Sequence, residues 1–158
     1  SKEKQFRLES QILPGIAVYE ILQTVMPKDE ALQTVRGYVA EHAWAMRKTT
    51  LKLLKAPGLY HLPPVLFSKL PPKFYGETAG FAATEYQTSG GVWRIDMTKC
   101  PYHDTCVEHN CPELCPCFCD SGDDIAYDDL HPKLVWHRTK TLGRGGDCCD
   151  FCLKLADK

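Results

Sequence analysis

Residues 81–97 read FAATEYQTSGGVWRIDM and decide the fold of the C-terminal half. The runs 81–86 and 92–97 are typical of strands, and Thr88-Ser89-Gly90-Gly91 separates them. A glycine-rich spacer of this length commonly connects the two strands of a β-hairpin. This stretch therefore predicts an antiparallel pair of strands.

A second hairpin is expected further along the chain, over residues 133–142 and 148–155. Gly143-Arg144-Gly145-Gly146 would join its two strands. The two hairpins together predict a small antiparallel sheet of about four strands. Between the hairpins lies a cysteine-rich connection, which we expect to be part helix and part loop.

The N-terminal part of the chain has helical periodicity. One helix is expected to end at Pro27, and a longer one should run from near Asp29 to Ala56-Pro57-Gly58. A short helix or turn is expected between Pro63 and Pro72. The apolar stripe of the long helix comprises Leu32, Val35, Val39, Ala43, Met46, Thr50 and either Leu53 or Leu54. Helices followed by strands predict an α+β fold, with the N-terminal helices packed on the sheet.

Length and composition limit the possible classes of protein. The 158 residues suit a single domain, with a helical part at 1–75 and the sheet plus the cysteine-rich connection at 76–158. No apolar run approaches the roughly 18 residues needed to span a bilayer, and because the N-terminal residues are polar and charged we expect no secretory signal. A net charge of −1 gives no long-range attraction to phosphate. We therefore expect a cytoplasmic protein that binds neither membranes nor nucleic acid.

The nine cysteines form two clusters, one between Cys100 and Cys119 and one between Cys148 and Cys152. An odd number of cysteines argues against a disulfide framework, and clustered thiols in a reducing compartment favour metal binding or thiol chemistry. Their spacings match no standard zinc-finger or ferredoxin pattern, so packed thiols remain the alternative. The candidate ligands for zinc or an iron–sulfur cluster are Cys100, His103, Cys106, Cys111, Cys115 and Cys117.

Cys119 is the candidate nucleophile. Pro116 disfavours a regular helix through the preceding residues, and Asp120 or Ser121 could cap a new helix. Cys119 would then precede a helix N-terminus, whose positive dipole favours the thiolate. The nearby carboxylates of Asp120, Asp123 and Asp124 oppose this effect, and they either serve as acid or base groups or solvate the helix start.

Successive side chains of the last predicted strand should point to opposite faces of the sheet. Cys149 and Phe151 should share one face of the sheet, while Asp150 and Cys152 should share the other. Cys149 and Cys152 then cannot bind one ion, and packing is expected for Cys152. On the neighbouring strand, Arg138 is a candidate for holding a substrate carboxylate, or it forms an ordinary ion pair.

An ordered set of short motifs resembles one family. The motifs are Cys100-Pro101, Cys111-Pro112-Glu113-Leu114, Phe118-Cys119-Asp120, Leu130-His131-Pro132, Arg138-Thr139-Lys140-Thr141-Leu142 and Gly145-Gly146-Asp147-Cys148-Cys149-Asp150-Phe151. The C-terminal third is similar to the L-2-amino-thiazoline-4-carboxylic acid hydrolase family. The resemblance implies hydrolytic opening of a thiazoline ring, and it places Cys119, Asp120, Arg138, Cys149 and Asp150 at motif positions. The cysteines and aspartates of this set, together with Asp124, are the predicted catalytic residues. Cys115, Cys117 and Cys152 exceed the thiols expected for that family, which favours the metal hypothesis.

Two hypotheses follow. In the first, the protein is a hydrolase acting on a small-molecule substrate and needs no cofactor. Cys119 attacks with Cys149 as its partner, Asp120 or Asp124 moves protons, and Arg138 holds the substrate carboxylate. In the second, it is a non-catalytic module that binds zinc, an iron–sulfur cluster or a small ligand.

Overall fold

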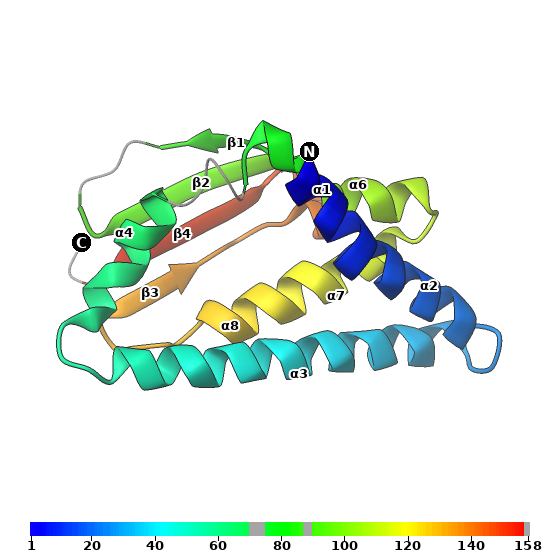
Figure 1. Ribbon diagram of the computed structural model, residues 1–158, viewed down its shortest axis with the longest axis horizontal. Helices are drawn as coiled ribbons and strands as arrows, with labels where there is room; N and C mark the ends of the chain where they lie inside the picture. Colours follow the sequence, from blue (N-terminus) through cyan, green and yellow to red (C-terminus); the bar gives the residue numbers. More distant parts are fainter. Residues whose placement is uncertain (70–74, 87–89, 157–158) are drawn as a thin grey trace.

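The structure is a computed structural model that describes residues 1–69, 75–86 and 90–156. Helices make up its N-terminal half, and a four-stranded sheet of order β1-β2-β4-β3 lies in the C-terminal half, which confirms the α+β prediction (Figure 1). Neighbouring strands are antiparallel throughout. The strands are β1 (Ala82–Glu85), β2 (Val92–Lys99), β3 (Leu134–His137) and β4 (Cys149–Leu155).

The helices begin and end close to the expected positions. The long helix is α3 (Lys28–Leu54), and Leu54 is its buried leucine, whereas Met46 of the predicted stripe is exposed. Of the segment expected between Pro63 and Pro72, residues 70–72 lie outside the described residues. The remaining helices are α1 (Lys2–Arg7), α2 (Leu13–Leu22), α4 (Leu62–Lys69), α6 (Pro101–Glu108), α7 (Cys115–Cys119) and α8 (Ile125–Tyr127), and a π-helical turn, Leu8–Ile12, joins α1 to α2.

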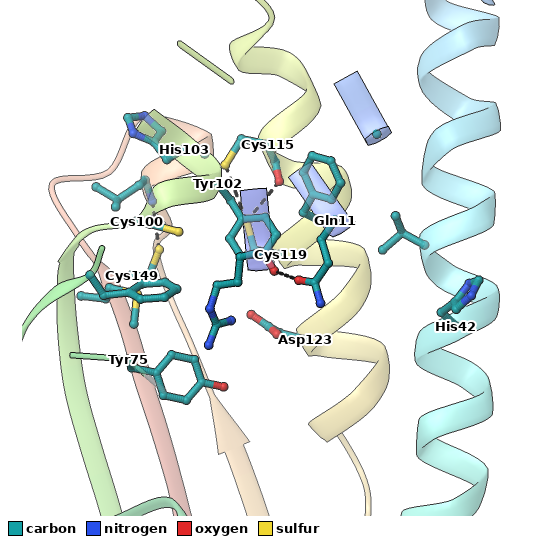
Figure 2. Close-up of a pocket in the computed structure, with 18 of the residues that line it drawn as sticks. Gln11, His42, Tyr75, Cys100, Tyr102, His103, Cys115, Cys119, Asp123 and Cys149 are labelled. Atoms are coloured by element: carbon teal, nitrogen blue, oxygen red, sulfur yellow. Dashed lines mark hydrogen bonds between the residues drawn. The ribbon is translucent and has the colours of Figure 1, made fainter. Parts of the chain in front are cut away.

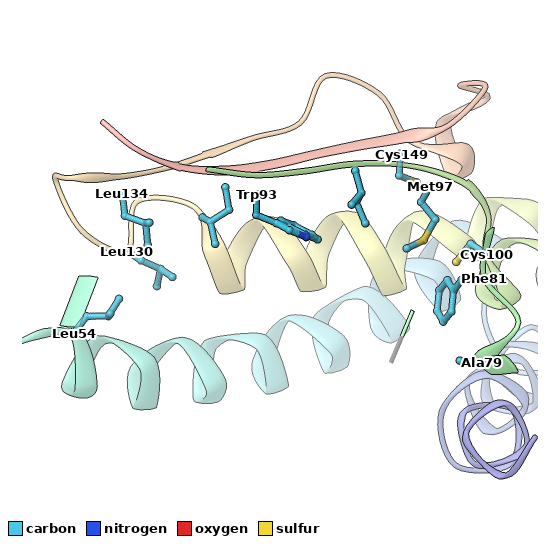
Figure 3. Packing of buried hydrophobic residues seen from close by; sticks show 11 residues of the cluster. Leu54, Ala79, Phe81, Trp93, Met97, Cys100, Leu130, Leu134 and Cys149 are labelled. Carbon is cyan, nitrogen blue, oxygen red and sulfur yellow. The ribbon is translucent and has the colours of Figure 1, made fainter. Parts of the chain in front are cut away.

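One face of the sheet carries the core. Along β2, Trp93, Ile95 and Met97 are buried and alternate with more exposed residues, as the two-residue period of a strand requires. Met97 is paired with Cys149 and Ile95 with Phe151, so the predicted sharing of one face is confirmed. Figure 3 shows this face turned toward the helices α7, α8 and α3. Side chains on this face therefore meet helical side chains across the interior.

The second hairpin is shorter than expected. β3 ends at His137, not at residue 142, because the Asp150 carboxylate accepts hydrogen bonds from the backbone N–H groups of Thr139 and Lys140 at 2.8 Å each. These donors would otherwise be available to a strand partner. Leu142–Arg144 then forms a 3-10 turn before β4. The first predicted hairpin pairs as expected, although residues 87–89 of its connection lie outside the described residues.

The prediction of a helix start after Cys119 is wrong. α7 runs through Cys119 and continues through a π-helical turn, Asp120–Asp124, directly into α8. Pro116 does not interrupt this helix because it lies in the first turn, where the missing N–H has no intrahelical acceptor. Cys119 therefore lies within a continuous helix and does not precede a helix N-terminus.

No helix among the described residues is long and apolar enough to cross a membrane.

Two glycines within helices provide a paired test of the packing between α2 and α7. A Cβ atom on Gly15 would lie 2.6 Å from the ring of Phe118, whereas one on Gly37 in α3 would meet nothing within 4 Å. We expect Gly15→Ala to lower the free energy of unfolding by about 1–3 kcal/mol through overpacking. Gly37→Ala should raise it by about 0.5–1 kcal/mol, because alanine is the better helix former. Urea denaturation measures both, and a stable Gly15→Ala protein would contradict this packing.

Candidate active site in a cysteine-lined cavity

A cavity of about 720 Å³ lies between the inner face of the sheet and the helices. Its volume is in the range of small-molecule sites. Figure 2 shows several of the predicted site residues around it. The structure brings together Cys119 and Cys149 from the predicted catalytic set, and Cys100, His103 and Cys115 from the predicted ligand set.

Each cavity thiol is positioned by a different local feature. Cys149 points inward from the first position of β4, and its sulfur accepts a hydrogen bond from the Leu142 backbone N–H at 3.3 Å. Cys100 directly follows β2 and is the N-cap residue of α6. Cys115 and Cys119 lie one helical turn apart on α7, with their sulfur atoms 3.9 Å apart, and the Cys119 thiol donates to the Cys115 carbonyl at 3.2 Å.

Burial keeps three of these thiols protonated. It raises the pKa of Cys100 to about 12, although the backbone N–H groups at the start of α6 lower it in part. It also raises the pKa of Cys149 to about 11. The pKa of Cys115 is raised by its hydrogen bond to Cys119 and by burial. Cys119 is the only one of the four cavity thiols that is not fully buried, so it is the accessible one.

The other predicted metal ligands point elsewhere. Cys106, Cys111 and Cys117 are buried in a separate apolar cluster with the N-terminal helices. Burial raises the pKa of Cys106, and its sulfur contacts Cys111. The Cys117 thiol donates to the Leu32 carbonyl at 3.9 Å. Within residues 1–69, 75–86 and 90–156, no group of three or more Cys, His, Asp or Glu side chains is arranged to hold a metal ion.

Arg138 binds protein carboxylates. Its side chain is only 4% exposed, and its guanidinium nitrogens lie 2.8 Å from Asp124, 3.3 Å from Asp123 and 3.5 Å from Asp120. Arg144 also pairs with Asp120. Arg138, Asp120 and Asp124, all predicted site residues, are not among the residues that line the cavity. The alternative of an ion-paired Arg138 therefore describes this structure.

Asp123 lines the cavity, whereas Asp120 and Asp124, to which the hydrolase hypothesis assigned proton transfer, do not. Burial raises its pKa to about 7; the positive charge of Arg138 opposes this rise, and the negative charges of Asp124 and Asp120 add to it. Asp123 lies four residues after Cys119 in one continuous helix, and residues four apart share a helix face, so both side chains reach the cavity. A group with a pKa near 7 can both accept and donate a proton at neutral pH.

The N-terminal helix contributes polar groups that no local motif indicated. Arg7 and Gln11 both line the cavity. The guanidinium of Arg7 lies 5.7 Å from the ring centre of Tyr75 and 5.1 Å from that of Phe81. Tyr102 donates a hydrogen bond to the Gln11 side chain. These contacts join residues more than 60 positions apart, so periodicity within one helix could not predict them.

Asp150 was predicted to be catalytic, but its contacts indicate a structural role, and the two roles can be distinguished by mutation. It lies outside the cavity lining and also accepts a hydrogen bond from the Thr139 hydroxyl. Burial raises its pKa, yet the hydrogen bonds from Thr139 and Lys140 outweigh this effect and hold the pKa below its usual value.

We expect Asp150→Ala to lower the free energy of unfolding by about 1–3 kcal/mol, because two backbone N–H groups lose their acceptor. Asp147→Ala is the matched control, since its carboxylate is exposed and pairs with the exposed Lys140, and its loss should change the urea midpoint much less. Loss of activity in Asp150→Ala without loss of stability would instead support a catalytic role.

Comparison with known proteins identifies the family. The family model described as L-2-amino-thiazoline-4-carboxylic acid hydrolase matches residues 5–153, which includes the N-terminal helices as well as the C-terminal motifs. Neither the curated proteins nor the solved structures give a match to this chain. The match covers nearly the whole chain, far more than the C-terminal third in which the motifs resemble the family. The chain therefore belongs to the L-2-amino-thiazoline-4-carboxylic acid hydrolase family.

Proposed function

We propose that the protein is a hydrolase that opens a small cyclic substrate at a carbon bonded to nitrogen and sulfur, such as an amino-thiazoline carboxylate. The reaction would take place in the cavity, with Cys119 as the reacting thiol. The observation that carries this proposal is that Cys119 and Asp123 line the same cavity from one continuous helix. The family name supports the reaction class.

Asp123 would serve as the base for Cys119. Its carboxylate takes the thiol proton, and the sulfur adds to the ring carbon between nitrogen and sulfur. The adduct collapses by releasing one of the two ring heteroatoms, which takes the proton from Asp123. Water then adds to the same carbon and gives a proton to Asp123. The bond to Cys119 breaks as this proton returns to its sulfur, so one water is consumed for each ring opened.

Arg7 would hold the substrate carboxylate. Arg138, the residue expected for this task, is already surrounded by three protein carboxylates. Among the described residues, Arg7 is the only arginine or lysine that lines the cavity. A guanidinium can bind a carboxylate through two parallel hydrogen bonds, which would orient the ring toward Cys119. Cys149 and Cys100, kept neutral by burial, would form the opposite wall.

Replacement of Cys119 tests the nucleophile. We expect Cys119→Ser to reduce turnover of 2-amino-thiazoline-4-carboxylate by at least about a hundredfold, because a hydroxyl is a much weaker nucleophile at neutral pH. Cys152→Ser is the control, since Cys152 is half-buried on the other face of the sheet. Thermal unfolding should be similar for both variants. An active Cys119→Ser enzyme would contradict the assignment, and stoichiometric zinc or a brown chromophore in anaerobically purified protein would favour a binding module.

The pH dependence tests Asp123. Its pKa is raised, so the carboxyl is protonated and inactive as a base below about pH 7. We expect kcat/KM to rise with pH with a midpoint near 7, and this limb should disappear in Asp123→Asn. Asp124→Asn should move the midpoint to lower pH, because it removes a negative charge that raises the pKa of Asp123. An unchanged limb in Asp123→Asn would exclude Asp123 as the base.

A further inference from the structure

Arg7 and Gln11 lie four residues apart on the N-terminal helix, which continues from α1 through the π-helical turn Leu8–Ile12. Residues at this spacing share one helix face, and both side chains line the cavity. Arg7 is half-buried, whereas Gln11 is exposed. A side chain that lines the cavity and is also exposed lies where the cavity meets solvent. Gln11 is therefore within reach of a ligand at the opening of the cavity.

The hydrogen bond from Tyr102 decides which end of the Gln11 amide points into the cavity. Tyr102 donates from its hydroxyl to Gln11 Oε1. The same hydroxyl is hydrogen-bonded to Arg7: burial raises the pKa of Tyr102 to about 12, and the positive charge of Arg7 and this hydrogen bond oppose the rise. Because a guanidinium can only donate, the Tyr102 oxygen accepts from Arg7, and its proton is left for Gln11. The amide nitrogen of Gln11 consequently turns away from Tyr102, as Figure 2 shows.

The Gln11 amide nitrogen is a donor that the protein leaves unused. Among the described residues, the side chain of Gln11 makes one hydrogen bond, which its oxygen accepts from Tyr102. An acceptor atom of a substrate can therefore bind this nitrogen without displacing a protein partner. On the same helix face, Arg7 supplies the guanidinium that the proposed function assigns to the substrate carboxylate. A charged donor and a neutral donor side by side match the two oxygens of one carboxylate.

We propose that Gln11 is a specificity-determining residue that binds the substrate carboxylate together with Arg7, and that Tyr102 is a positioning residue that keeps the Gln11 amide nitrogen turned toward it. The identity of the reacting ring rests on the proposed function, whereas the recognition of a carboxylate rests on these three side chains. The pair discriminates against the corresponding carboxamide, because either orientation of its NH2 group would face a donor, Arg7 or Gln11. The substrate class is therefore a small ring that carries a free carboxylate.

Two unreactive analogues test this recognition without turnover. They are 2-aminothiazole-4-carboxylate and 2-aminothiazole-4-carboxamide, whose aromatic rings are not hydrolysed. Calorimetric titration of the wild type should show at least about thirtyfold tighter binding of the carboxylate, because it accepts charge-assisted hydrogen bonds. Gln11→Glu should weaken carboxylate binding by at least about tenfold through like-charge repulsion, without weakening carboxamide binding. Gln33→Glu is the matched control, since it makes the same charge change at an exposed position of α3 outside the cavity lining and should leave both dissociation constants unchanged.

Tyr102→Phe tests the positioning role, since it keeps the ring and removes only the hydroxyl. The Gln11 amide can then turn its oxygen toward the NH2 group of the carboxamide, so the ratio of the two dissociation constants should fall by about threefold to tenfold. A merely structural role for Tyr102 would weaken the binding of both analogues alike and leave this ratio unchanged. An unchanged ratio in Tyr102→Phe, unchanged carboxylate binding in Gln11→Glu, or no carboxylate preference in the wild type would overturn the proposal.

Turnover separates this proposal from the hydrolase assignment. If Gln11→Glu and Tyr102→Phe change binding as expected but the wild type does not hydrolyse 2-amino-thiazoline-4-carboxylate, the hydrolase assignment fails and the carboxylate site stands. If the wild type hydrolyses this compound and Gln11→Glu has the same KM, the carboxylate site fails and the hydrolase assignment stands.

Discussion

The pairing of Arg138 with Asp120, Asp123 and Asp124 is the interaction on which the site depends. Arg138 directly follows β3, so its buried guanidinium joins the sheet to the helix that carries the carboxylates. An arginine can be buried there because several charged partners compensate for its lost hydration. The same pairing fixes the rotation of this helix about its axis. Asp123 and Cys119 consequently face the cavity from one side of the helix.

The sequence predicted those features that depend on local periodicity. Strand alternation placed Cys149 on the inner face, and the register of β4 against β2 confirms it. The prediction from the sequence failed at the helix through Cys119. A proline can either break a helix or begin one, and Pro116 lies in the first turn, where it begins one. Proton transfer was assigned to Asp120 or Asp124 because a new helix was expected to begin at Asp120 or Ser121, whereas the continuous helix places Asp123, four residues after Cys119, on the same face.

Other parts of the site depend on contacts between distant segments. Arg7 reaches the cavity because α1 lies beside the end of the sheet, as Figure 1 shows. Phe67 and Phe151, two aromatic side chains of the cavity lining, are 84 positions apart, and only the packed structure brings both into contact with Trp93. Hydrophobic patterning indicates that such residues are buried, but it does not specify their neighbours. This explains why the fold was predictable from the sequence, whereas only some of the residues that line the site were.

The account makes Cys119 the thiol that meets the substrate, and chemical protection measures this directly. Iodoacetamide would alkylate the protein with and without saturating 2-amino-thiazoline-4-carboxylate, and mass spectrometry would follow each cysteine. The account predicts that the ligand slows alkylation of Cys119 and leaves that of Cys152, on the opposite face of the sheet, unchanged. Equal alkylation rates of Cys119 with and without ligand would contradict it.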